Sequence, residues 1–349
     1  MNAQDALQRV WRSRNVLAIA LLPAAWAYGL LARLDRQRQL TWRRAPAVPV
    51  IVVGNAVVGG GGKTPVVIEL VHWLRAQGWH PGVISRGYGR STDGSSPTRL
   101  VEPDADPREV GDEPLLLRQR TGSPLVVGAN RLQAVAALCA AAPATDIVVS
   151  DDGLQHHALD ASLRICVWDR EGLGNGWLLP AGPLREPWPP QADFFLCSDD
   201  DGCGPGAAPG ARSAQQATPA GSFVVRRRLA QRARNASGQT CSLAELAAQP
   251  VQVWTGIARP ERFIQALRAA GLQLAAVQRY PDHYHFDSDS DKPDARYPLI
   301  CTEKDAVKLW HRFPQAWAVA LELEVDPSFW QALAVRLRPL SSDDGPQAA

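Results

Sequence analysis

The chain has 349 residues, of which 46% are hydrophobic and 21% charged, and this is ordinary usage for a globular protein with room for two domains. Its formal net charge is only +2, which gives no reason to expect nucleic acid as a partner. Six cysteines are scattered without a Cys-x-x-Cys pair, a pattern that favours reduced thiols over a disulfide framework or a zinc site.

The first predicted element is an apolar segment between two groups of arginines. Residues 16–32 carry no charge, while residues 1–44 hold eight arginines against two aspartates, a net charge of +6. The segment is shorter than the roughly 20 apolar residues of a spanning helix, and Pro23 and Gly29 weaken it further. We therefore expect an interfacial anchor whose arginines meet anionic lipid headgroups. A cleavable signal peptide and a buried core helix are the alternatives.

A glycine-rich loop lies between an apolar run at 48–53 and an amphipathic run at 65–74, which predict a buried parallel strand and a helix. Backbone N–H groups of such a loop can converge on an anion, Lys63 can reach the β and γ phosphates, and the Thr64 hydroxyl can hold Mg²⁺. The strict Gly-x-x-x-x-Gly-Lys-Thr spacing would place glycine at Val57. The order of strand, loop and helix favours an ATP-binding P-loop over a flexible linker. The candidate nucleotide-binding residues are Val57, Val58, Gly59, Gly60, Gly61, Gly62, Lys63 and Thr64.

Beyond the loop, short apolar runs alternate with helical stretches. Strands are expected at 81–85, 125–127, 146–150 and 163–168, with a helix at 130–142 between two of them. This alternation predicts a doubly wound α/β fold with a mainly parallel sheet. Asp151 and Asp152 directly follow the third of these strands, at the carboxyl edge where such sheets collect ligands. They are the candidate Mg²⁺ ligands together with Thr64.

Two further acidic motifs are candidates for activating an acceptor. Gly111-Asp112-Glu113-Pro114 opens a helical run, where the carboxylates could equally serve as an N-terminal cap. Asp282-His283-Tyr284-His285 combines carboxylate with imidazole, although a solvated loop would also explain it. An attacking alcohol must lose a proton, so either motif could supply the base.

The second half predicts a smaller α/β domain. Strands are expected at 250–254, 299–301 and 318–321, and helices at 260–270 and 305–310. We expect four parts: an N-terminal membrane-associated helix at 1–45, a P-loop core at 46–228 with a mobile insertion near 201–222, a C-terminal domain at 229–340 that closes the cleft, and a disordered tail at 341–349.

Taken in chain order, these motifs are specific. Their order is Gly54-Asn55, Gly59 to Pro65, Ser85-Arg86-Gly87-Tyr88-Gly89, Gly111 to Pro114, Asp151-Asp152-Gly153-Leu154-Gln155-His156, Leu179 to Pro187, Pro281-Asp282-His283 and Thr302 to Lys308. Over roughly residues 10–335 the chain resembles the tetraacyldisaccharide 4′-kinases of lipid A biosynthesis. The resemblance implies transfer of the γ-phosphate of ATP to the 4′-hydroxyl of a tetraacylated disaccharide 1-phosphate, giving lipid IVA at the cytosolic face of the bacterial inner membrane.

The resemblance also implies roles for particular residues. Lys63 would bind the ATP phosphates, Thr64 and Asp152 would bind Mg²⁺, and Asp112 with His283 would activate the sugar hydroxyl. Secondary site residues would be Asp151, His156, Arg185, Glu186 and Arg131. The acceptor would be a membrane glycolipid, which gives the apolar, basic N-terminus a purpose.

Two other classes share some of these features. A membrane-attached GTPase would have the same phosphate loop, but its guanine motif needs Asn/Thr-Lys-x-Asp, and Lys304 and Asp305 are adjacent here. An ATP-binding regulator without catalytic activity would need no acceptor machinery, so dependence on Asp112 would distinguish it from a kinase.

Overall fold

The computed structural model describes residue 7 and residues 9–59, 62–87, 97–169, 172–198 and 218–341. A single sheet of 13 strands, most of them parallel to their neighbours, runs through this part of the chain, in the order β11-β10-β12-β13-β8-β7-β6-β1-β5-β2-β4-β3, with β9 paired to β8. The strands are β1 Val50–Gly54, β2 Pro81–Ser85, β3 Thr98–Leu100, β4 Leu125–Gly128, β5 Ile147–Asp151, β6 Leu163–Trp168, β7 Phe194–Ser198, β8 Ser222–Arg234, β9 Thr240–Ser242, β10 Val251–Thr255, β11 Leu274–Arg279, β12 Leu299–Thr302 and β13 Trp317–Val325.

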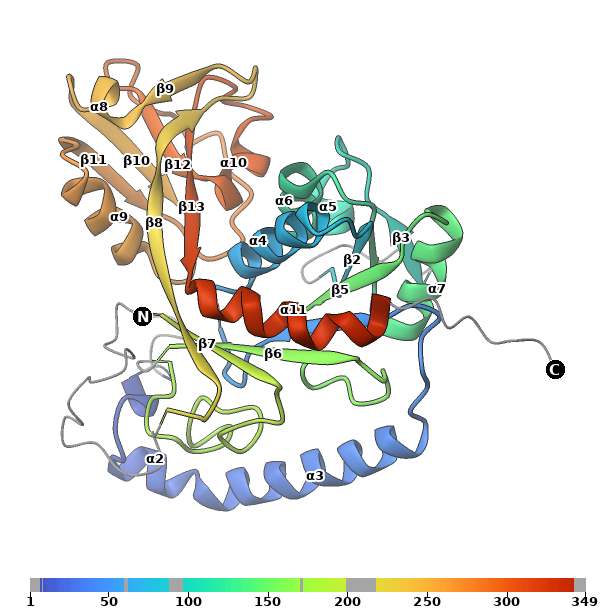
Figure 1. The fold of residues 1–349 in the computed structure, drawn as a ribbon. Coiled ribbons are helices and arrows are strands. Elements are labelled where there is room, and N and C mark those ends of the chain that lie inside the picture. Colours follow the sequence, from blue (N-terminus) through green and yellow to red (C-terminus); the bar gives the residue numbers. More distant parts are fainter. Residues whose placement is uncertain are drawn as a thin grey trace.

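Helices cover this sheet and extend away from it (Figure 1). They are α2 Val16–Ala20, α3 Leu22–Thr41, α4 Lys63–Ala76, α5 Pro107–Val110, α6 Asp112–Thr121, α7 Arg131–Ala141, α8 Leu243–Leu246, α9 Pro260–Ala269, α10 Glu303–Leu309 and α11 Pro327–Ser341.

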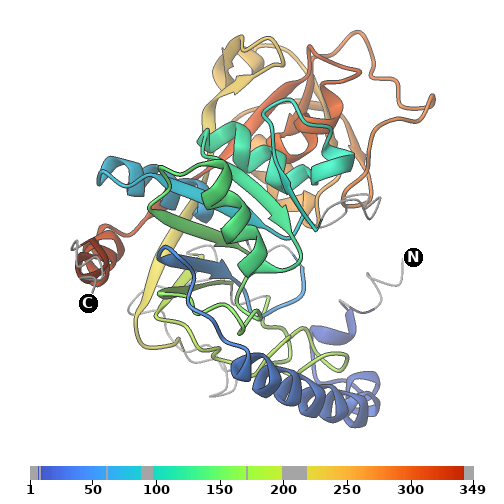
Figure 2. The ribbon, with the colours of Figure 1, turned by 90° about the vertical axis from the view of Figure 1, so that its right-hand side faces the viewer.

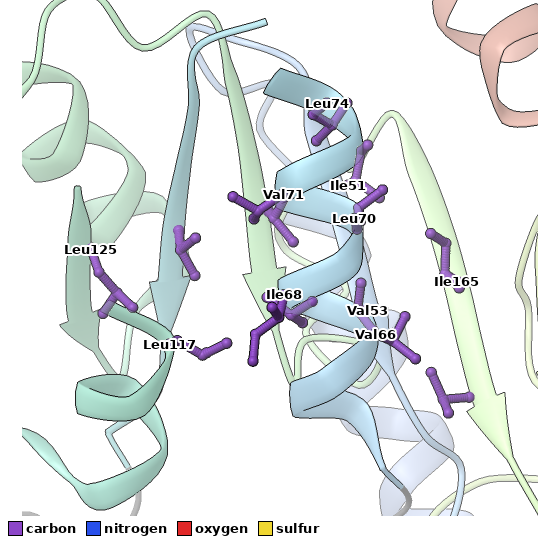
Figure 3. Packing of buried hydrophobic residues seen from close by; sticks show 14 of the residues in the cluster. Ile51, Val53, Val66, Ile68, Leu70, Val71, Leu74, Leu117, Leu125 and Ile165 are labelled. Atoms are coloured by element: carbon purple, nitrogen blue, oxygen red, sulfur yellow. The ribbon is translucent and has the colours of Figure 1, made fainter. Parts of the chain in front are cut away.

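Residues 50–198, which we call the first unit, form the predicted doubly wound α/β core. Strand β1 lies between β5 and β6, parallel to both, and every residue of it is buried. Its β-branched residues suit a strand that is covered on both faces. Helix α4 packs its apolar side on the sheet, and Figure 3 shows Leu70 of this helix close to Ile51 of β1. The P-loop therefore connects the buried strand β1 to the packed helix α4, and both hold its ends in place.

Residues 240–309, which we call the second unit, form a smaller α/β layer with parallel β11, β10 and β12. Two long strands, β8 and β13, pair antiparallel and run from the first unit to the second (Figure 1). The predicted boundary at residues 228 and 229 falls inside β8, which spans Ser222–Arg234. The division into domains therefore stays a prediction. The antiparallel pair of β8 and β13 connects the first unit to the second.

The N-terminal helices α2 and α3 lie on the outside of the molecule, at the edge of the first unit (Figures 1 and 2). Only Ala18 and Ala25 are buried in them, while Val16, Leu17 and Trp26 are 81%, 65% and 71% exposed. The buried core helix is therefore the wrong alternative for this segment. Neither of them, nor any other helix in the described ranges, has the length and apolarity needed to cross a bilayer.

Cys139, Cys166, Cys241 and Cys301 are free thiols, as the spacing of the cysteines predicted. Cys197 is disulfide-bonded, so for this residue the expectation of a reduced thiol is wrong. The expected insertion lies outside the described residues except for 218–222, and of the expected tail only residue 341 lies inside them.

Candidate active site

The P-loop places Lys63 at the first position of α4, directly after Gly62. Gly62 is the N-cap of the helix with φ +73°, a left-handed conformation that glycine adopts without strain. The Nζ atom of Lys63 lies 2.9 Å from Oδ1 of Asp152 and 3.3 Å from Oδ1 of Asn55. Lys63 is therefore already turned toward the end of β5. Gly60 and Gly61 lie outside the described residues.

The start of the loop is attached to the segment that contains Arg185. Val57 is buried and forms a bridge with Leu184, and the N–H of the half-exposed Val58 donates to the carbonyl of Pro183 at 3.0 Å. The N–H of Arg185 donates to the carbonyl of Ala56 at 2.7 Å. The Leu179 to Pro187 motif thus lies beside the loop, although more than 120 residues separate the two in sequence.

Asp151 and Asp152 end strand β5 in different environments. Asp151 is buried; one of its oxygens accepts from Ser85 at 3.2 Å, and its Oδ1 has no hydrogen-bond partner among the described residues. Burial, followed by the neighbouring charge of Glu113, raises the pKa of Asp151. Burial acts in the same sense on Asp152, but the charges of Lys63 and Arg185 outweigh it and lower the pKa of that carboxyl. Asp152 also has φ +51°, and such strain in a non-glycine residue is typical of functional sites.

Arg131 is hydrogen-bonded to the backbone at the end of β5. Its guanidinium is buried and donates to the carbonyls of Gly128, Asp151 and Asp152 at 2.7, 3.3 and 3.1 Å. Burial lowers the pKa of Arg131, and the two aspartates oppose that effect. These contacts hold the backbone that carries both carboxylates, and the nucleotide-binding role of Arg131 stays a prediction.

Arg185 contacts Asp152 directly, and Gln155 links Arg185 to Glu186. Nη1 of Arg185 lies 3.5 Å from Asp152 and 3.4 Å from the amide oxygen of Gln155. The amide nitrogen of Gln155 donates to Glu186 at 2.7 Å. Burial raises the pKa of Glu186. Asp152 is thus contacted by both Arg185 and Lys63, and Gln155 also donates to the carbonyl of Asn55 at 3.0 Å. The catalytic roles of Arg185 and Glu186 stay predictions.

His156 follows Gln155 and lies at the margin of the site. Its Nε2 atom is buried without a partner among the described residues, and burial, aided by the charge of Arg131, lowers the pKa of the ring. His156 lines a cavity of about 310 Å³ together with Trp42, Arg44, Asn130, Leu132, Gln133 and Ala158.

The second group of predicted residues comes from both units. Asp112 is the first residue of α6, and His283 lies in the loop between β11 and β12. Nδ1 of His283 is 3.0 Å from Oδ2 and 3.1 Å from Oδ1 of Asp112, although 171 residues separate them. His283 has φ +63°, so its backbone is held in an unfavourable conformation that the surrounding structure must stabilise. The structure thus brings together the two residues that the resemblance paired.

Charge is concentrated around this pair. Burial alone would raise the pKa of Asp112, but the hydrogen bond from His283 and the charges of Lys304 and Lys308 lower it far below its usual range. The hydrogen bond with Asp112 raises the pKa of His283, while burial and Lys304 oppose the increase. Asp112 is therefore ionised at neutral pH, and the imidazole of His283 holds a proton more readily than a free histidine does.

Sequence reasoning did not assign Lys304 and Lys308, which come from α10. Nζ of Lys308 is 3.2 Å from Asp112, and Nζ of Lys304 is 3.0 Å from Glu113 and 3.2 Å from Asp282. Their spacing of four residues places both on one side of a helix, and this spacing could have indicated from the sequence that they face the same site. Asn55, which contacts Lys63, was noted only as part of a motif.

Thr64, Asp151 and Asp152 were predicted to hold Mg²⁺. In the described ranges no group of three or more His, Cys, Asp or Glu side chains could hold a metal ion without further ligands. A Mg²⁺ ion in a kinase uses one or two carboxylates, with phosphate oxygens and waters for the rest. The buried, unpaired Oδ1 of Asp151, with the carboxylate of Asp152 next along the chain, fits such an ion.

Comparison with known proteins gives consistent results. Residues 17–338 match the family described as tetraacyldisaccharide-1-P 4′-kinase. The chain is 48% identical over 342 residues to the tetraacyldisaccharide 4′-kinase of Acidovorax sp. (strain JS42), covering 97% of this chain and 96% of that protein. It is 46% identical to the protein of the same name from Delftia acidovorans, with the same coverage.

A solved structure has the same fold. It is the "apo" form of LpxK from Aquifex aeolicus in complex with ATP, which superposes with a TM-score of 0.77 at 24% sequence identity. The match covers 93% of this chain and 99% of the other. The P-loop α/β architecture predicted from the sequence is thereby confirmed.

Proposed function

The chain belongs to the tetraacyldisaccharide-1-P 4′-kinase family, and we propose that it carries out this family's reaction where the P-loop, the start of α6 and the loop of His283 meet. The enzyme transfers the γ-phosphate of ATP to the 4′-hydroxyl of tetraacyldisaccharide 1-phosphate, a membrane glycolipid, in lipid A biosynthesis. The acceptor oxygen bonds to the γ-phosphorus, the bond from that phosphorus to the bridging oxygen breaks, and ADP leaves. The hydroxyl proton must pass to a base.

Lys63 and the P-loop bind the phosphates of ATP in this proposal. The ammonium of Lys63 is held 2.9 Å from Asp152 at the end of a buried strand, so little reorganisation is needed to stabilise charge on the transferring group. Arg185 is a second cation beside the same carboxylate. Thr64, Asp151 and Asp152 would hold Mg²⁺, which when bound neutralises phosphate charge and orients the phosphates.

The contact between Asp112 and His283 is the observation that carries the assignment of the acceptor site. A carboxylate and an imidazole 3.0 Å apart can orient an alcohol and take its proton as one device. Glu113, adjacent to Asp112, is close enough to Asp151 to raise its pKa. In this proposal the acceptor pair works on the phosphate that Lys63 and Asp152 hold, and the electrostatic effect of Glu113 on Asp151 supports this arrangement.

The N-terminal helices supply the attachment to the membrane in this proposal. Their exposed side presents Val16, Leu17, Ile19, Trp26, Leu30, Leu31 and Leu34, each more than half exposed. Arginines flank this surface, which suits the anionic cytosolic face of the inner membrane. The hydroxyl of Tyr28 donates to the carbonyl of Arg185 at 3.0 Å, so α3 is also tied directly to the active-site segment. A lipid acceptor would thus be presented beside the catalytic groups.

Label transfer tests this function. Purified protein is incubated with γ-labelled ATP and tetraacyldisaccharide 1-phosphate in detergent micelles, and label is measured in the lipid. We expect transfer that depends on added Mg²⁺ and is lost in Lys63→Ala. Label that enters water as phosphate at the same rate with and without lipid would contradict the acceptor assignment.

A further inference from the structure

Lysine is rare in this chain, and most of its lysines lie in the candidate active site. It contains 33 arginines but only four lysines, at positions 63, 292, 304 and 308. Three of the four lie in the site described above, and Lys292 is exposed. Lys63 has a role in binding phosphate. The proposed function gives no role to Lys308, although the side chain of Lys308 is only 2% exposed.

Lys308 is directed at Asp112. Its Nζ atom donates to Oδ2 at 3.2 Å, the same oxygen that lies 3.0 Å from Nδ1 of His283. Its Nζ atom also lies 5.8 Å from the centroid of the Phe286 ring, and its charge opposes the effect of burial that raises the pKa of Asp305. An ammonium in such surroundings is costly to bury unless it is paired, and Asp112 is the carboxylate that pairs with it.

The helix that carries Lys308 also fixes the loop of His283. Thr302 caps α10 by accepting from the N–H of Asp305 at 3.1 Å. Asp305 in turn accepts from the N–H of Gly256 at 3.1 Å, and the carbonyl of Gly256 accepts from the N–H of His283 at 3.3 Å. The Thr302 to Lys308 motif therefore contacts the pair from two directions, through the backbone of His283 and through the carboxylate of Asp112.

Helices α10 and α6 lie side by side at the junction of the two units (Figure 1). Besides Lys308 and Asp112, Lys304 pairs with Glu113, and Arg120 pairs with Glu303. These contacts dock the second unit on the helix that begins with Asp112. Of them, the bond from Lys308 is the one that reaches the carboxylate contacted by His283.

We propose that Lys308 is a positioning residue for the phosphoryl acceptor site, holding Asp112 ionised and oriented toward His283. The inference deepens the proposed function and rests on it. Lys308 acts through Asp112 and does not itself meet the substrate.

The charges around Asp112 define what the loss of Lys308 would do. Lys304 and His283 also face the carboxylate, while Glu113 and Asp282 add negative charge nearby. An opposite charge at this distance favours the ionised form of a carboxylate by about one pKa unit or more. Removing the Lys308 ammonium therefore makes protonation of the Asp112–His283 pair easier, whichever of the two groups receives the proton from the acceptor hydroxyl.

The test compares Lys308→Met, Lys308→Arg and the control Lys292→Met by label transfer from γ-labelled ATP to tetraacyldisaccharide 1-phosphate. Methionine keeps nearly the length of the lysine side chain without its charge, and Lys292 is an exposed lysine of the same unit. We expect Lys308→Met to lower kcat at least about tenfold, to leave the KM for ATP within about twofold, and to move the acidic limb of the kcat profile up by about one pH unit. Lys308→Arg should restore the pH profile, and Lys292→Met should match the wild type.

Different outcomes separate the two proposals. If the wild type transfers no label to the lipid, the proposed function fails. If the wild type is active and Lys308→Met has its kcat and pH profile, the positioning role alone fails. Since Lys308→Met leaves a buried carboxylate without its cation, it could fail to fold. The comparison is then between Asp112→Asn, which leaves the Lys308 ammonium without its carboxylate, and Asp112→Asn/Lys308→Met, which removes both charges, with the fold of each checked by circular dichroism. Equal rates in these two variants support action through Asp112, and a further large loss in the double variant overturns it.

Discussion

The contact between Asp112 and His283 predicts that a substitution of either residue removes the same catalytic function, the removal of the proton from the acceptor hydroxyl. The suitable substitutions are Asp112→Asn, which removes the charge but keeps the shape, and His283→Asn, because asparagine tolerates the φ of +63° at this position better than alanine does. Neither asparagine can act as a base. The P-loop is unchanged in both variants, so ATP binding should survive.

The expected size of the effect follows from the role of the pair. General base catalysis contributes about 10²- to 10⁴-fold to a rate. If each single variant loses about 10³-fold, independent action would predict a loss of about 10⁶-fold in the double variant, whereas one shared device predicts about 10³-fold. The difference of about 10³-fold corresponds to a coupling energy of about 4 kcal/mol.

Single-turnover transfer of label from ATP to the lipid measures this coupling without a contribution from product release. Each variant is first checked for its fold by circular dichroism and for ATP affinity by titration. Losses that multiply in the double variant would refute the shared device, and the kinase assignment would still stand on Lys63 and Asp152.

Three further predictions follow from the structure. Lys63→Ala and Asp152→Ala should each lower turnover by about 10²-fold or more in a folded protein, because both groups interact with charge on the transferring phosphate; near-normal label transfer by Lys63→Ala would exclude its assigned role. Because the bond with Asp112 raises the pKa of His283, the imidazolium stabilises the folded state at acidic pH. The Tm of the wild type should therefore exceed that of His283→Asn most below about pH 6.5, and the excess should fade as the pH rises through the higher folded pKa; a difference in Tm that is constant up to about pH 9 would contradict this. Trp26→Asp and Leu30→Asp, at exposed positions of α3, should reduce co-sedimentation with anionic vesicles, whereas the control Val335→Asp, at an exposed position of α11, should not. High salt should release the wild type from the vesicles only in part, and complete release by salt would rule out apolar insertion.

Much of the fold of the first unit could be predicted from local pattern. Strands β2 and β6 occur at the predicted residues, and the helix expected at 65–74 spans Lys63–Ala76, because buried strands and amphipathic helices leave periodic apolar signals. The place of Asp151 and Asp152 at the carboxyl end of β5 was predictable for the same reason.

Two long elements of the fold were missed, one without an apolar signal and one with it. Strand β8 is 13 residues long, and its run of arginines gave no apolar signal because many of its side chains are exposed. Helix α11 buries Phe329, Leu333 and Leu337, whose spacing of four residues was not used.

The acceptor site shows where local reasoning ends. Nothing in the spacing of Asp112 and His283 indicates contact across 171 residues, and only the family resemblance paired them. Lys308 was part of a recognised motif, but its role depends on how α10 docks on α6, which is a property of tertiary packing.

The most direct measurement is the structure of the lipid product, determined by phosphorus NMR and mass spectrometry after incubation with ATP and Mg²⁺. We predict one new phosphate ester at the 4′-oxygen with the 1-phosphate unchanged, formed about 10³-fold more slowly by Asp112→Asn at an ATP concentration that it still binds. A phosphate at another position, a diphosphate at position 1, or full product from Asp112→Asn would contradict the account.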